Sequence, residues 1–122
     1  LFQIWIEPNQ TGIEPRWDAR KFPKETRDGR LEILASGRPE DRDSDALTIH
    51  QDAAVLGATL TAGEEIAHRL GAGRSAYIVP ARGTLEINGR PAPERSGTAV
   101  TDVDDITIRA MTEAEVVVVD VP

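Results

Sequence analysis

Residues 82–89 read Arg-Gly-Thr-Leu-Glu-Ile-Asn-Gly, a short alternating run that leads directly into an Asn-Gly turn. Asn-Gly in this setting is a strong signal for a β-hairpin, because both residues tolerate positive φ. Further short, β-branched runs lie on either side, at residues 31–35, 46–50, 53–60, 64–70, 76–81, 84–87, 98–101, 106–110 and 115–121. Turn residues separate these runs, and no window favours a long amphipathic helix. The pattern therefore predicts an all-β fold, and we expect a barrel.

The chain before this β region reads differently. Residues 1–6, Leu-Phe-Gln-Ile-Trp-Ile, alternate like a strand, whereas Pro8, Gly12 and Pro15 prevent a long regular element directly after them. We expect a single compact domain with a strand and irregular connecting arm over residues 1–30 and the barrel over residues 31–122. The apolar opening lacks both an initiator Met and the basic start of a signal peptide. We therefore expect a piece of a longer, cytoplasmic protein.

Composition restricts the function further. The 122 residues include no Cys, which excludes disulfides, thiolate catalysis and sulfur-ligated metal sites. The 14 Lys and Arg against 21 Asp and Glu give a formal net charge of -7, which disfavours nucleic acid as a partner. The apolar runs are too short to span a bilayer, so we expect no membrane partner. Only His50 and His68 remain as imidazoles for metal binding or acid–base chemistry.

The turn glycines of the β region resemble the spacing of the cupins, which are double-stranded β-helix (jelly-roll) barrels. Laid on Gly63, the first cupin motif places its metal ligands at Arg69, Gly71 and Ala76, and it closes on Gly83. Laid on Gly89, the second motif places its histidine at Val100. None of these four residue types binds a metal here. The resemblance therefore implies a cupin barrel with a degenerate, metal-free site.

A more specific resemblance begins in the arm. The segment QIWIEPNQTGIEP at residues 3–15 resembles the connecting segment of pirin-like proteins, and the similarity continues at residues 21–22, 51–53 and 82–89. Pirin-like proteins are bicupins, and some act as quercetin 2,3-dioxygenases. The resemblance implies that this chain is the connecting segment plus the C-terminal barrel. It also implies that iron or another divalent metal belongs to an N-terminal cupin domain, which would be the partner of this chain.

The two histidines are weak site candidates. His68 precedes the first metal position by one residue, so strand alternation is expected to turn it away from the barrel interior. We expect a surface or interface histidine there. His50 ends a strand without a positioned partner and is expected to be a hydrogen-bonded strand-end residue. We predict no catalytic residue and no metal ligand in this chain.

Two acidic groups resemble cation sites but are better explained without a cation. Asp41, Asp43, Asp45 and Asp52 have part of the spacing of a calcium loop, yet Ala46 replaces the glycine that such a loop requires. We expect residues 37–45 to form a solvated loop. A second group, at Asp102, Asp104 and Asp105, surrounds a turn, where short carboxylates commonly bond their own backbone.

Aromatic residues gather in the arm, at Phe2, Trp5, Trp17 and Phe22. They would either pack onto the barrel of the same chain or form an interface with another domain or subunit, because aromatic side chains anchor interfaces. If a partner barrel normally covers part of this domain, the isolated chain is expected to self-associate.

Three functions follow from this reading. The first is a metal-free C-terminal barrel that supports a quercetinase-type N-terminal barrel. The second is a small-molecule-binding or protein-interaction module without catalysis, which an open pocket with a few polar groups would favour. The third, a freestanding cupin enzyme, is the weakest, because the metal positions hold Arg69, Gly71, Ala76 and Val100.

Overall fold

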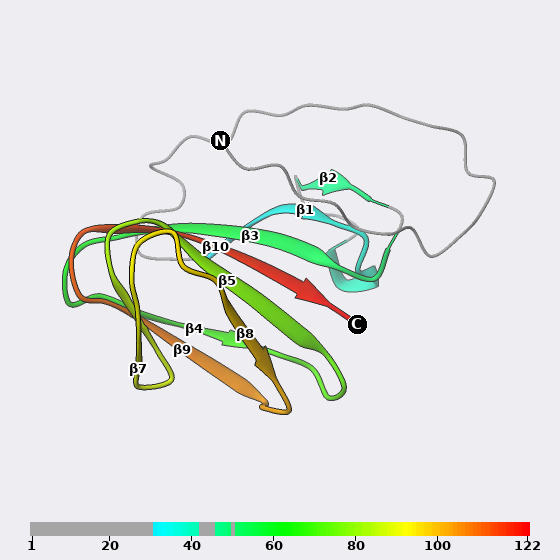
Figure 1. The fold of residues 1–122 in the computed structure, drawn as a ribbon. Helices are drawn as coiled ribbons and strands as arrows, with labels where there is room; N and C mark the ends of the chain where they lie inside the picture. The colour runs from blue at the N-terminus through cyan, green and yellow to red at the C-terminus, as the bar shows by residue number, and fades with distance from the viewer. Residues whose placement is uncertain (1–30, 42–45, 50) are drawn as a thin grey trace.

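The computed structural model describes residues 31–41, 46–49 and 51–122. This part of the chain forms two β-sheets that face each other (Figure 1). Its elements are β1 (Glu32–Ser36), the 3₁₀ helix η2 (Pro39–Asp41), β2 (Leu47–Thr48), β3 (Ala54–Leu60), β4 (Glu65–Arg69), β5 (Ser75–Arg82), β6 (Leu85–Ile87), β7 (Arg90–Ala92), β8 (Thr98–Thr101), β9 (Asp105–Ala110) and β10 (Ala114–Val121). None of the helical structure in these residues is long and apolar enough to cross a membrane.

The chain crosses repeatedly between the sheets, as a jelly roll requires. The larger sheet has the order β2-β1-β3-β10-β5-β8, and the smaller sheet has the order β4-β9-β6-β7. All the strand pairs are antiparallel except β1 with β2. The prediction of an all-β barrel is therefore confirmed.

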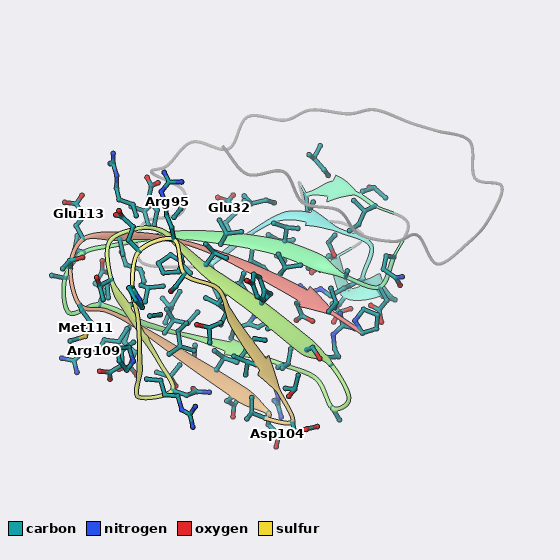
Figure 2. The ribbon with its side chains drawn as sticks, viewed as in Figure 1. Glu32, Arg95, Asp104, Arg109, Met111 and Glu113 are labelled. Atoms are coloured by element: carbon teal, nitrogen blue, oxygen red, sulfur yellow. The ribbon has the colours of Figure 1, made fainter. Side chains whose placement is uncertain are left out.

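The core lies between the two sheets, where alternate residues of each strand point inward (Figure 2). β10 is central in the larger sheet, and its residues alternate strictly between buried and half-buried. Val118 at its centre is fully buried and pairs with Leu56 on one side and Ile78 on the other. Burial of each such side chain contributes about 1.5–3 kcal/mol, and the smaller sheet supplies comparable side chains from its own inner face, including Leu85, Ile106 and Ile108.

The hairpin predicted at Asn88-Gly89 is present. Asn88 and Gly89 have φ of 48° and 82°, and they join β6 to β7. Positive φ at both turn residues matches the right-handed twist of the flanking strands. β7 itself was not among the predicted runs, because Pro91 makes its sequence look unlike a strand; as an edge strand it tolerates that proline.

Gly83 shows why one turn in this fold requires glycine. Its φ is +78°, and a Cβ atom there would overlap the Glu113 carbonyl oxygen in the turn before β10. Gly63 also has a positive φ, of +89°, but a Cβ atom there would meet nothing within 4 Å. A substitution at Gly63 therefore tests the cost of the left-handed backbone alone, and a substitution at Gly83 tests that cost together with steric overlap.

We predict that Gly83→Ala lowers the free energy of unfolding by clearly more than the matched variant Gly63→Ala. The second variant should lose about 1–2 kcal/mol from left-handed backbone strain alone, while the first adds the overlap with backbone. Urea unfolding of both variants measures the difference. Equal losses would show that the turn at Gly83 relaxes freely.

Candidate functional site

A group of charged and polar side chains lies where β10 ends, and all of it is largely buried except Asp52, whose side chain is 49% exposed. Its central residue is Asp120, the last inward-pointing residue of that strand, with 1% of its surface exposed. We call this group the ionic cluster, and its members are Ser36, Arg38, Asp41, Asp52, His68, Arg74 and Asp120. They come from both sheets and from the loops that join them, so the cluster connects parts of the chain that are distant in sequence.

Three basic side chains converge on the Asp120 carboxylate. His68 Nε2 lies 2.8 Å from Oδ2, and Arg74 Nε donates to Oδ1 at 2.6 Å. Arg38 Nη1 approaches Oδ2 at the longer distance of 3.5 Å. Since His68 is on β4 of the smaller sheet and Asp120 is on β10 of the larger one, their contact ties the two sheets together.

An outer ring of acceptors holds the two arginines. Arg74 donates from Nη1 to Asp52 Oδ2 at 2.9 Å and from Nη2 to the Asp52 carbonyl oxygen at 2.7 Å. Arg38 donates from Nε to Asp41 Oδ2, which also accepts a hydrogen bond from Ser36 Oγ at 2.6 Å. The cluster thus fastens the turn after β1 and the loop before β3 to the end of the barrel.

The balance of burial and charge keeps Asp120 ionised. Burial alone would raise the pKa of its carboxyl group, but hydrogen bonds from His68 and Arg74, together with their charges, lower it below the usual value. Burial likewise opposes the charge on the Arg74 guanidinium, but Asp120 and Asp52 raise its pKa. The cluster therefore contains a stable, buried ion pair at neutral pH.

The structure corrects the expected orientation of His68. His68 is buried at 8% exposure, whereas Arg69, which the cupin spacing placed at an inward metal position, is exposed. The phase of β4 is set by its pairing with β9, where His68 lies opposite the fully buried Ile106. The expectation of a surface or interface histidine that points away from the interior is therefore wrong.

Only two of the four degenerate metal positions point into the barrel. Ala76 and Val100 are buried cross-strand partners in the larger sheet, and Asp120 lies opposite Ala76 on its other side. Gly71 is exposed and lies beside the stem of Arg74: a Cβ atom on Gly71 would lie 3.1 Å from Arg74 Cδ. Next to Asp120 and Ala76, the chain therefore places the guanidinium group of Arg74.

The acidic loop is less solvated than expected. The side chains of Arg38 and Asp41 are only 10% and 7% exposed, so the prediction of a solvated loop is wrong for this part of residues 37–45. Asp43, Asp45 and His50, with all the arm aromatics (Phe2, Trp5, Trp17 and Phe22), lie outside the described residues. Asp102, Asp104 and Asp105 are exposed, and Asp102 has a φ of 58°, as in a tight turn.

Sequence reasoning did not identify Asp120, Arg74 or Arg38 as members of a site. One signal was available: the run Ala-Glu-Val-Val-Val-Val-Asp-Val at residues 114–121 has an acidic residue at a position that alternation places inside. A carboxylate in such a position requires a cationic partner. The sequence does not show which of the 14 Lys and Arg residues supplies it.

We predict that Arg74→Met lowers the free energy of unfolding by about 3–5 kcal/mol, because it removes the cation that donates to Oδ1 of the buried Asp120 carboxylate. The matched control Arg69→Met removes an exposed arginine and should change stability by less than about 0.5 kcal/mol. Adding Asp120→Leu to Arg74→Met should recover part of the loss. If the losses of the two single variants simply added in the double variant, the interaction between Arg74 and Asp120 would be contradicted.

The lowered pKa of Asp120 also predicts how stability depends on pH. The folded-state value lies below the unfolded value of about 3.9, so the stabilisation is complete above that pH and is lost as pH falls through the folded value. The wild type should therefore be more stable than Asp120→Asn at neutral pH, and the difference should shrink in acid. Urea midpoints from about pH 7 to about pH 2.5 test this. A constant difference would contradict an ionised Asp120.

The chain is similar in sequence to known proteins over most of its length. Residues 33–121 match the family described as "Quercetinase C-terminal cupin domain". A pirin-like protein of Caulobacter vibrioides is 49% identical over 120 residues, which cover 98% of this chain and 51% of that protein. Quercetin 2,3-dioxygenase of Escherichia coli is 34% identical over 122 residues, covering 100% of this chain and 50% of that protein.

Solved structures give the same result. The crystal structure of YhhW from Escherichia coli matches with a TM-score of 0.86 and 32% identity, over 97% of this chain and 48% of that one. The same pirin in complex with nickel(II) matches with a TM-score of 0.82 and 31% identity, over 94% of this chain and 47% of that one. The chain spans about half the length of the curated relatives it matches. It belongs to the pirin-like family of quercetinase C-terminal cupin domains.

Proposed function

We propose that this chain is the metal-free half of a pirin-like bicupin and supports an N-terminal barrel that holds the metal. The relatives are about twice its length, which leaves room for a second barrel in the complete protein. One relative is named a quercetin 2,3-dioxygenase and another is described in complex with nickel(II). We place iron or another divalent metal, and any dioxygenase chemistry, in the second barrel.

The observation that carries this proposal is the apolar outer face of the larger sheet. Val117 and Val119 of β10 alternate with the core residues and are only half-buried. Across the sheet, Val119 pairs with Val55 on β3 and with Tyr77 on β5, which is 51% exposed, and Val117 pairs with Val79. A sheet face that only meets water is usually polar, and a contiguous apolar patch is typical of an interface.

This face would pack against the second barrel in the complete protein. A second copy of the chain is the alternative partner for the same face, which is the physical basis for the expected self-association. The barrel interior also supports placing the metal in the other barrel. Ala76 and Val100 have no metal-binding side-chain atoms, and the Asp120 carboxylate is already bonded to Arg74 and His68.

The test uses the complete gene product with Val119→Glu, and Ala67→Glu as the matched control. Both positions point outward, but Ala67 lies on the smaller sheet and is exposed. Val119→Glu should separate thermal unfolding into two transitions, because a carboxylate in the interface uncouples the two barrels. Ala67→Glu should keep the wild-type profile. Metal analysis should find a divalent metal in the complete protein, and His68→Ala should not change its amount.

Three results would contradict the proposal. The first is a stoichiometric metal in the 122-residue chain that is lost in His68→Ala. The second is quercetin-dependent oxygen consumption by the 122-residue chain alone. The third is identical unfolding of Val119→Glu and Ala67→Glu, which would show that the outer face does not couple the two halves.

A further inference from the structure

A groove opens between the free edges of the two sheets. β7 is an edge strand of the smaller sheet and β8 is an edge strand of the larger one (Figure 1). Residues of both strands line the groove. The groove has a volume of about 350 Å³. Its lining residues are Ile87, Asn88, Arg90, Thr98, Ala99, Val100, Thr101 and Val103. None of them belongs to the ionic cluster.

The floor of the groove is apolar and reaches the barrel interior. Ile87 and Val100 are 2% and 9% exposed and belong to the hydrophobic core, and Val103 packs against that core. Ile87 and Val100 leave little accessible surface, so an apolar group in the groove would mainly meet the half-buried Val103, which the core holds in place. Such a floor with a small number of polar groups above it is the usual composition of a small-molecule site.

The polar lining contains one cation and no carboxylate, in a chain with a net charge of -7. Arg90 is exposed and forms no ion pair with any residue that the structure describes. Asn88 Oδ1 accepts a hydrogen bond from the Thr107 N–H at 2.8 Å, so its amide NH₂ group is the part left to donate. Asp102 follows Thr101 but is exposed outside the lining, where solvent screens its charge. The lining therefore favours an anion.

A peptide strand is a poor occupant. Pro91 in β7 has no N–H to donate to an added strand, and β8 is only four residues long. The volume of about 350 Å³ is near the lower end of the usual range for ligand sites, roughly 300–1,000 Å³, which suits one or two rings. We propose that the groove binds a small aromatic carboxylate, with its ring against Val103 and the accessible edge of Val100 and its carboxylate beside Arg90.

The proposal is tested by titrating the ¹⁵N-labelled 122-residue chain with 2-naphthoate and following its amide resonances. Saturable shifts should centre on residues 87–90 and 98–103. Arg90→Gln should weaken binding about threefold, as expected for an exposed charge pair. The control Arg109→Gln removes an exposed arginine outside the groove lining and should leave the affinity unchanged (Figure 2).

Two further comparisons separate charge from apolar contact. Thr101→Glu places a carboxylate in the groove and should weaken binding more than Arg90→Gln does. The neutral analogue 2-naphthamide should bind the wild type less tightly than 2-naphthoate. The proposal is overturned if no resonance shifts, if the shifts centre on the outer face around Tyr77 and Val119, or if Arg90→Gln and Arg109→Gln bind alike.

Discussion

A carboxylate that is 99% removed from solvent needs cationic partners, and the end of this barrel is arranged around that need. Asp120 is 1% exposed, and its partners come from β4, from the residue before β5 and from the turn after β1. Each of these bonds holds the strand or loop of its basic residue against the end of β10. The Asp120 carboxylate therefore links the two sheets, and through the two arginines it also holds the loop at Asp52 and the helix η2. It does so beside the core residues Ala54 and Ala76, which are its neighbours across the sheet.

β10 serves two packing surfaces at the same time. Its inward residues fill the core and end in Asp120, while its outward valines lie on the exterior of the larger sheet. A strand in a solvent-facing sheet usually alternates apolar with polar residues, whereas the run at residues 116–119 is valine on both faces. The strand is central in its sheet, which is consistent with an element that meets protein on both sides.

Local signals predicted most of this fold, and long-range contacts explain what they missed. The Asn88-Gly89 turn and the β-branched runs depend on neighbouring residues, so the hairpin and most of the strands could be identified. Which residues of β4 point inward depends on its pairing with β9. Counting from Gly63 placed Arg69 inside, whereas the structure has His68 inside. The ionic cluster joins His68 to Asp120 across 52 residues of sequence, and no spacing rule covers that distance.

The position of Arg74 restricts how such a barrel could change over evolutionary time. Its stem lies beside Gly71 and its guanidinium group donates to Asp120, so a mutation that removed it would take away one of the three basic partners of a buried carboxylate. A lineage moving toward a metal centre here that lost Arg74 first would pass through a less stable ancestor. The order of substitutions would therefore matter, because replacing Asp120 before Arg74 avoids an intermediate with a buried carboxylate that has lost this partner.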